Sequence, residues 1–301
     1  MNNNIYLHSF NGRVNKIGSI VLKSILLELS CTPKPGLVDR LNSGANRDMD
    51  FNTFIQSTSA IAYGFYQIIG LGMDFSRETG KLLTELRKIG RIMEEKMFEA
   101  TGGINTQKGL IFIEGLICAS AGSLERKKMN LSTEMICQQI KIICKGIVDR
   151  DLRSLNQNNR GKILTNGERL FLDEGISGIR GEAEKGFPTV RKVGLPVLQK
   201  GLKKGLSLND ACVQALISIM TITQDTNVIS RSNLNFLKNK VQRKAKEILE
   251  IGGIYTEAGR KAIHDLDKLF IEKGINPGGS ADLLAATITL HYLSLLPTAG
   301  N

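Results

Sequence analysis

Residues 275–284 combine side chains that can hold a phosphate group and a metal ion. Their sequence, INPGGSADLL, places a proline, two glycines, a hydroxyl and a carboxylate at the start of an apolar stretch. Glycine lets backbone N–H groups approach an anion closely, and the first turn of a helix carries the positive end of the helix dipole. We therefore expect Gly278, Gly279 and Ser280 to contact phosphate, with Ser280 capping the helix and Asp282 at the mouth of the site.

Four further segments combine glycine, amide and charged residues in a similar way: residues 32–40, 102–109, 178–188 and 224–231. Together with residues 275–284, and in this order, they resemble the triphosphoribosyl-dephospho-CoA synthase family. The resemblance runs from about Cys31 to about Leu293. Members of this family make the precursor of the prosthetic group of citrate lyase and malonate decarboxylase acyl carrier proteins.

The resemblance implies a transfer of the triphosphoribosyl group of ATP to the ribose 2′-hydroxyl of 3′-dephospho-CoA, with release of adenine. The product would pass to a phosphoribosyl-dephospho-CoA transferase acting on an acyl carrier protein, of either pathway. A glycosyl transfer of this kind has an oxocarbenium-like transition state. It needs a carboxylate near the sugar, an acceptor for the hydroxyl proton, and neutralisation of the triphosphate.

Cations and amides within the five segments are the candidate phosphate and ribose ligands. Arginine binds phosphate through two parallel hydrogen bonds, lysine acts as a point charge, and an amide both donates and accepts. The expected substrate-binding side chains are Lys34, Arg40, Asn105, Lys108, Arg180, Asn227 and Arg231.

The cofactor that we expect is Mg²⁺, bridging phosphate oxygens through one or two carboxylates. Asp225 and Asp282 are the predicted ligands. Both residues also suit an ordinary role, either as a helix cap or as a partner for arginine.

Glu182 is the predicted catalytic carboxylate, because it directly follows Arg180 and Gly181 within a glycine-bearing segment. Glu184 is two residues further on, so on a helix it points elsewhere, and we expect a supporting role for it. Asp39, beside Arg40, is the rival general base.

Gln107 is a departure from the family pattern, which usually has histidine at this place in an Asn-Thr-x-Lys-Gly segment. Glutamine keeps the hydrogen bonds of histidine but does not change charge near neutral pH. If the family's histidine donates a proton to adenine, turnover by this protein should be slow. If the histidine only positions a ligand, glutamine can take over that function. We expect Gln107 to be a positioning, substrate-binding residue.

Two other functions compete with the transferase. A magnesium-dependent hydrolase of ADP-ribose or similar glycosides would use paired carboxylates of an Asp-Thr-Asp type, whereas residues 225–227 offer one acid. A non-catalytic nucleotide-binding regulator would tolerate the change at Gln107.

The net charge indicates anionic partners. The chain has 301 residues, 42% of them hydrophobic, and a net charge of +11. Such a charge attracts anions, but the basic residues are spread along the chain and no motif that reads nucleic acid bases is visible. Polyphosphate metabolites explain the charge equally well, and the resemblance implies ATP and a CoA derivative, so we expect no nucleic acid partner.

The cysteines and apolar stretches predict a cytoplasmic protein. Five cysteines without a Cys-x-x-Cys pair indicate buried thiols in a reducing compartment, and three histidines without ligand spacing do not indicate zinc. No uncharged apolar run reaches eighteen residues, so we expect no membrane span. The oligomeric state stays open.

Apolar periodicity predicts the helices that must position these segments. Residues 17–29 and 54–69 have apolar side chains at helical spacing, and residues 110–121 are apolar on all sides, which is typical of a central helix. Further helices are expected at 76–98, 131–148, 208–222, 235–250, 256–273 and 282–295.

The predicted fold is therefore all-α: one compact, bundle-like domain over residues 1–301, with glycine-rich loops at helix N-termini. The asparagine-rich segment 156–165 is the candidate linker or lid.

Overall fold

The computed structural model describes residues 12–75, 81–154 and 164–298. In these residues the regular secondary structure is helical and includes no strand, which confirms the all-α prediction. Most of the linker candidate, residues 156–163, lies outside the described part of the chain.

The N-terminal half contributes long helices. They are α2 (Gly12–Ser30), α3 (Phe51–Asp74), α4 (Leu82–Ala100), α5 (Lys108–Arg126) and α6 (Thr133–Ile143), followed by a π-helical turn, η2 (Asp149–Arg153). The chain continues with α8 (Asn166–Glu174), α9 (Gly178–Glu184), the π-helical turn η3 (Val190–Gly194) and α10 (Leu195–Lys203).

The C-terminal part contains α11 (Leu208–Met220), α12 (Thr226–Arg231), α13 (Leu234–Phe236), the π-helical turn η4 (Leu237–Gln242) and α14 (Arg243–Glu250). It ends with the 3₁₀ turn η5 (Gly253–Tyr255), α15 (Glu257–Lys273) and α16 (Gly278–Ser294).

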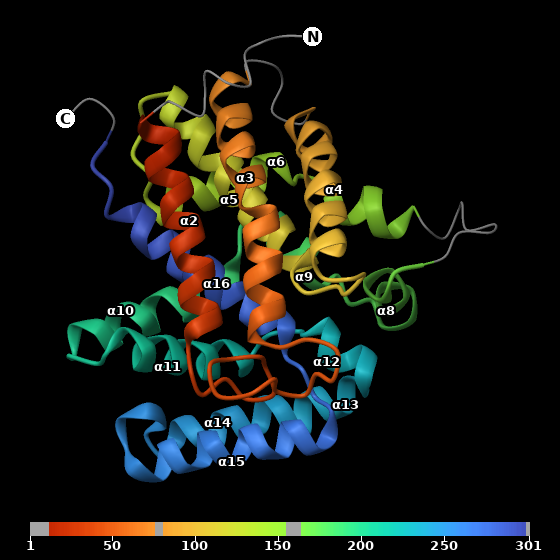
Figure 1. The fold of residues 1–301 in the computed structure, drawn as a ribbon, viewed down its shortest axis with the longest axis vertical. Coiled ribbons are helices and arrows are strands. Elements are labelled where there is room, and N and C mark those ends of the chain that lie inside the picture. Colours follow the sequence, from red (N-terminus) through yellow and green to blue (C-terminus); the bar gives the residue numbers. More distant parts are fainter. Residues whose placement is uncertain (1–11, 76–80, 155–163, 299–301) are drawn as a thin grey trace.

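Two apolar helices lie at the centre of the molecule. Nearly every residue of α5 from Leu110 to Glu125 is buried, and α16 is buried along most of its length. Helices α2, α3 and α4 stand beside them, while α14 and α15 form an antiparallel pair across one end (Figure 1). The prediction of a central helix at 110–121 is confirmed.

The buried apolar side chains form one cluster that extends from α2 to α16. It consists mainly of isoleucine and leucine. The number of domains stays a prediction.

Glycines 278 and 279 belong to the first turn of α16 and not to a preceding loop. The expectation that Ser280 caps this helix is wrong, because Pro277 occupies the cap position and α16 begins one residue later. The fixed φ of proline suits a helix start, so the helix begins earlier than a serine cap would place it.

Two aspartates hold the loop between α2 and α3. Both oxygens of Asp39 accept hydrogen bonds within the loop, from the backbone N–H groups of Lys34, Leu41 and Asn42 and from the hydroxyl of Thr32. Asp267 of α15 accepts from the backbone N–H of Gly36 and from Asn42 Nδ2, and so attaches the loop to α15.

Candidate active site

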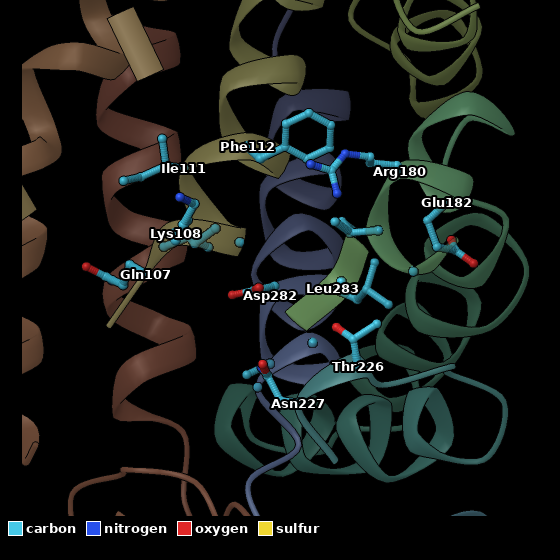
Figure 2. A pocket seen from close by; sticks show the side chains of 18 of the residues that line it. Gln107, Lys108, Ile111, Phe112, Arg180, Glu182, Thr226, Asn227, Asp282 and Leu283 are labelled. Atoms are coloured by element: carbon cyan, nitrogen blue, oxygen red, sulfur yellow. The ribbon is translucent and has the colours of Figure 1, made fainter. Parts of the chain in front are cut away.

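One large cavity, of about 1640 Å³, opens between α4, α5, α9, α12 and the start of α16. Figure 2 shows α5 and α9 on two sides of it, with Asp282 of α16 between them. The predicted site residues that line it are Lys34, Asn105, Gln107, Lys108, Arg180, Glu182, Asp225, Asn227, Arg231, Gly278, Gly279 and Asp282. The five sequence segments therefore converge on one place.

Asp39, Arg40 and Ser280 are not among the lining residues. Asp39 is 2% exposed and its oxygens are engaged by its own loop, so it shapes the loop and is not placed as a general base. Arg40 is exposed, and its Nε donates to the carbonyl oxygen of Ser30 at 2.6 Å. These positions correct the roles expected for Asp39 and Arg40.

Asp282 is the carboxylate nearest the centre of the site in Figure 2, and it packs against Gly109 of α5. Burial raises the pKa of Asp282 well above its usual value, and the negative charges of Glu28, Asp225 and Glu114 raise it further. The folded protein therefore favours the protonated carboxyl of Asp282 unless a cation compensates its charge.

Asp225 joins α12 to α16. Its Oδ1 accepts from the backbone N–H groups of Asn227 and Val228, which caps α12, and its Oδ2 accepts from the N–H and the hydroxyl of Ser280 at 2.8 and 3.0 Å. Burial raises the pKa of Asp225, and the Ser280 hydrogen bonds partly oppose this. Ser280 therefore positions Asp225 from behind the cavity wall.

Glu28 is a lining residue that sequence reasoning missed. It is 8% exposed on α2, and its Oε1 accepts from Lys34 Nζ at 2.5 Å, while Lys34 is 2% exposed. Buried charges usually occur in such pairs. The signal in the sequence was a charged residue interrupting the apolar stretch 17–29.

The side-chain amide of Gln107 faces α3. Its Oε1 accepts from Ser57 Oγ at 2.5 Å and from Thr58 Oγ1 at 3.3 Å, and its Nε2 donates to Thr58 Oγ1 at 2.9 Å. Figure 2 shows this amide directed away from Asp282. Gln107 is 4% exposed, so it links α5 to α3 at the edge of the cavity.

Glu182 and Arg180 lie on α9, on the other side of the cavity from Gln107 (Figure 2). Glu182 accepts from the hydroxyl of Thr189 at 2.8 Å and from its N–H at 3.2 Å. Arg180 Nε donates to Asp151 at 3.3 Å. Thr189 therefore fixes the orientation of the Glu182 carboxylate.

Asn105 and Lys108 shape the start of α5. Asn105 Oδ1 accepts from the N–H of Lys108 at 3.3 Å, and Lys108 Nζ pairs with Glu94 of α4 at 2.8 Å. Asn227 and Arg231 of α12 are exposed to the cavity, and in the described part of the chain no protein group hydrogen-bonds their side chains.

The donor set fits a magnesium ion that keeps most of its ligands from phosphate and water. In the described residues no group of three or more acidic, histidine or cysteine side chains forms a complete metal site. Asp282 nevertheless supplies a carboxylate that lines the cavity, and a cation would compensate its charge, whereas the oxygens of Asp225 already accept four hydrogen bonds. Mg²⁺ uses one or two carboxylates in this way.

Comparison with known proteins identifies the family. A sequence model of the ATP:dephospho-CoA triphosphoribosyl transferase family matches residues 14–299. The chain belongs to this family.

Curated relatives of the triphosphoribosyl transferase family resemble the chain along nearly its whole length. It is 39% identical to the 2-(5''-triphosphoribosyl)-3'-dephosphocoenzyme-A synthase of Klebsiella pneumoniae over 283 residues, 94% of this chain and 91% of the relative. Proteins with the same name, qualified as probable, match in Vibrio cholerae (40% identity, covering 92% of this chain and 88% of the relative) and in Malonomonas rubra (37%, 93% and 88%). No solved structure matches the chain significantly.

The family confirms the resemblance carried by the five segments and makes the protein a transferase, so the hydrolase and the regulator are not favoured. None of the described helices of this transferase has the length and apolar character needed to cross a bilayer.

Proposed function

We propose that the cavity binds ATP and 3′-dephospho-CoA together and transfers the triphosphoribosyl group to the ribose 2′-hydroxyl of dephospho-CoA. The bond between C1′ of the ATP ribose and N9 of adenine breaks, and a bond between C1′ and the 2′-oxygen of the acceptor forms. The hydroxyl proton goes to a protein base, and adenine leaves with the bonding electron pair and takes up a proton.

The observation that carries the proposal is the placement of Asp282. This carboxylate lies at the cavity floor with Glu28, Asp225 and Glu114 near enough to raise its pKa. A carboxyl group that needs a compensating cation, close to the N-terminus of a helix, suits a magnesium-bound polyphosphate.

We propose Asp282 as the carboxylate that would hold Mg²⁺, which, when bound, neutralises phosphate charge. Asp225, whose oxygens already accept four hydrogen bonds, would contribute its negative charge beside the ion. The first turn of α16 would hold the triphosphate, with Asn227 and Arg231 beside it on α12. A Cβ at Gly278 would stand 2.5 Å from Asn227 Nδ2, so the Asn227 amide lies directly against this turn.

Glu182 is the proposed acceptor of the hydroxyl proton. It lines the cavity on α9, and Thr189 orients both of its oxygens. Each carboxylate oxygen retains a second lone pair that can accept from a substrate hydroxyl.

The product is proposed to pass to a phosphoribosyl-dephospho-CoA transferase that loads an acyl carrier protein of citrate lyase or malonate decarboxylase. The cytoplasm is the proposed compartment, since the five cysteines are free, buried thiols.

The decisive experiment follows adenine released from ATP with Mg²⁺, by chromatography, with and without 3′-dephospho-CoA. Release that requires the acceptor supports the transferase. Release of adenine in the absence of the acceptor, or cleavage of ADP-ribose, would indicate a hydrolase. Nucleotide binding without release would indicate a regulator.

A further inference from the structure

Four arginines gather on one wall of the cavity, and three of them lie outside the segments that carry the family resemblance. Arg87 and Arg91 come from α4, Arg150 from η2 and Arg180 from α9. All four line the same cavity, and we call them the arginine wall.

The arginine wall is organised around one carboxylate. Asp151 accepts a hydrogen bond from Arg87 Nη2 and another from Arg180 Nε, through the same oxygen. The guanidinium groups of α4 and α9 are therefore brought together although they lie far apart in the sequence. Asp151 side-chain exposure is 14%, against 41% for Arg87 and 30% for Arg180, so the guanidinium groups keep surface free.

In the part of the chain that the structure describes, the other two arginines donate hydrogen bonds to backbone carbonyl groups. Arg91 Nε donates to the carbonyl oxygen of Arg87 at 3.3 Å, and Arg150 Nη1 donates to that of Lys145 at 2.8 Å. Ion pairs between this wall and Asp151 are formed by Arg87 and Arg180.

An excess of guanidinium groups on a concave surface attracts anions. A cleft lined by charges of one sign concentrates the field, and guanidinium forks match phosphate oxygens in geometry. Solvated arginines at a convex surface lack that focusing, whereas these four face a cavity of about 1640 Å³.

The two proposed substrates each carry a polyphosphate, and one anion site cannot hold both. In the proposed function the triphosphate of ATP lies at the first turn of α16, near Asp282. The diphosphate of dephospho-CoA then needs a second cationic surface in the same cavity, and the arginine wall offers one.

We propose that the arginine wall binds the diphosphate of 3′-dephospho-CoA, with Asp151 as the positioning residue that holds Arg87 and Arg180 together. The choice of substrate rests on the proposed function, because it follows from placing the triphosphate at α16.

The test measures 3′-dephospho-CoA binding by calorimetry in the absence of ATP, together with the KM of each substrate. Arg91→Gln and Arg87→Gln should each weaken dephospho-CoA binding about tenfold or more, as expected for a lost charge-assisted phosphate contact. The KM of dephospho-CoA should rise in parallel. The KM of ATP should stay within about twofold of the wild-type value, because the substituted arginines contact dephospho-CoA and not ATP in this proposal.

Arg126→Gln is the matched control. Arg126 is exposed at the end of α5, does not line the cavity, and should leave both constants unchanged. Arg91→Gln guards against misfolding, since Arg91 is exposed and its Nε bonds only its own helix.

Two results would overturn the proposal. A rise in the KM of ATP alone would assign the wall to the triphosphate, and unchanged binding of both substrates would make the arginines solvated surface. A wild-type protein that releases no adenine with both substrates present would instead contradict the proposed function.

Discussion

The carboxylate of Asp282 lies directly against Gly109: a Cβ at position 109 would stand 2.1 Å from Asp282 Oδ2. No real Cβ contact is that short, so α5 can carry only glycine here while Asp282 keeps its position. The glycine of the Lys-Gly pair at the start of α5 thus makes room for the proposed metal ligand of α16.

Gly109→Ala should therefore impair catalysis much more than folding. The Asp282 side chain must turn away, and a displacement of about 1 Å at a reacting site can cost about a hundredfold in rate. Stability should change by no more than ~1 kcal/mol, since alanine favours helix. Adenine release and thermal unfolding measure the two effects. Gly12→Ala, with nothing within 4 Å, is the control; equal activity of both variants would contradict this role of Gly109.

Asp282→Asn should abolish magnesium-dependent turnover and raise stability at neutral pH. The folded protein holds the Asp282 proton more tightly than the unfolded chain, so stability falls as pH rises from 3.8 through the raised pKa. Asparagine does not ionise, so the variant should not lose stability through this group as pH rises. Unfolding midpoints at pH 4 and pH 8 should show a difference between variant and wild type that grows with pH. Full magnesium-dependent activity in the variant would rule out the assignment.

Glu114 makes a second pH-dependent contribution to stability. It is 0% exposed, its Oε1 accepts from Thr289 Oγ1 at 2.9 Å, and its Oε2 has no hydrogen-bond partner in the described structure. Burial raises its pKa from 4.5 to about 8, so wild-type stability is lost as pH rises through this interval.

Glu114→Gln should remove that loss. At ~1.4 kcal/mol per pKa unit, the variant should gain several kcal/mol relative to wild type between pH 5 and pH 9. Denaturant unfolding at several pH values measures the gain, and Glu95→Gln at an exposed position of α4 should follow the wild-type curve. If the free energy of unfolding of Glu114→Gln and of wild type had the same pH dependence between pH 5 and pH 9, Glu114 would be ionised in the folded protein over this range.

The long apolar helices could be predicted because their periodicity is local. The predicted helix at 110–121 lies within α5, and the predicted helix at 208–222 starts at the first residue of α11. An apolar face of this length is typical of a single helix. The predicted helix at 235–250 is also found, as one helical run over residues 234–250 that contains the π-helical turn η4. The site helix α9, in contrast, has only seven residues. Periodicity cannot define elements that short.

The candidate site was predictable only where its residues lie in compact motifs. The segments around Asp225 and Asp282 converge as expected. Glu28 and Arg87 were missed because their partners Lys34 and Asp151 are decided by packing between helices, which no local pattern reveals. Ser280 was misplaced as a cap for the same reason, since its partner, Asp225, lies 55 residues earlier.

Gln107→His tests whether the family's usual histidine at this position acts as an acid or as a positioning group. The Gln107 amide is held by Ser57 and Thr58 and faces away from Asp282, so a histidine here would bond the same hydroxyl groups. We expect a modest change in turnover, less than about tenfold, and a pH–rate profile set by other residues, because a group held this way is not aimed at the leaving base.

The measurement is acceptor-dependent adenine release between pH 5 and pH 9, with Ser59→Ala on the exposed side of α3 as control. A gain of about a hundredfold with a new limb near pH 6.5 would identify the histidine as a general acid, and would mean that the natural protein works without it.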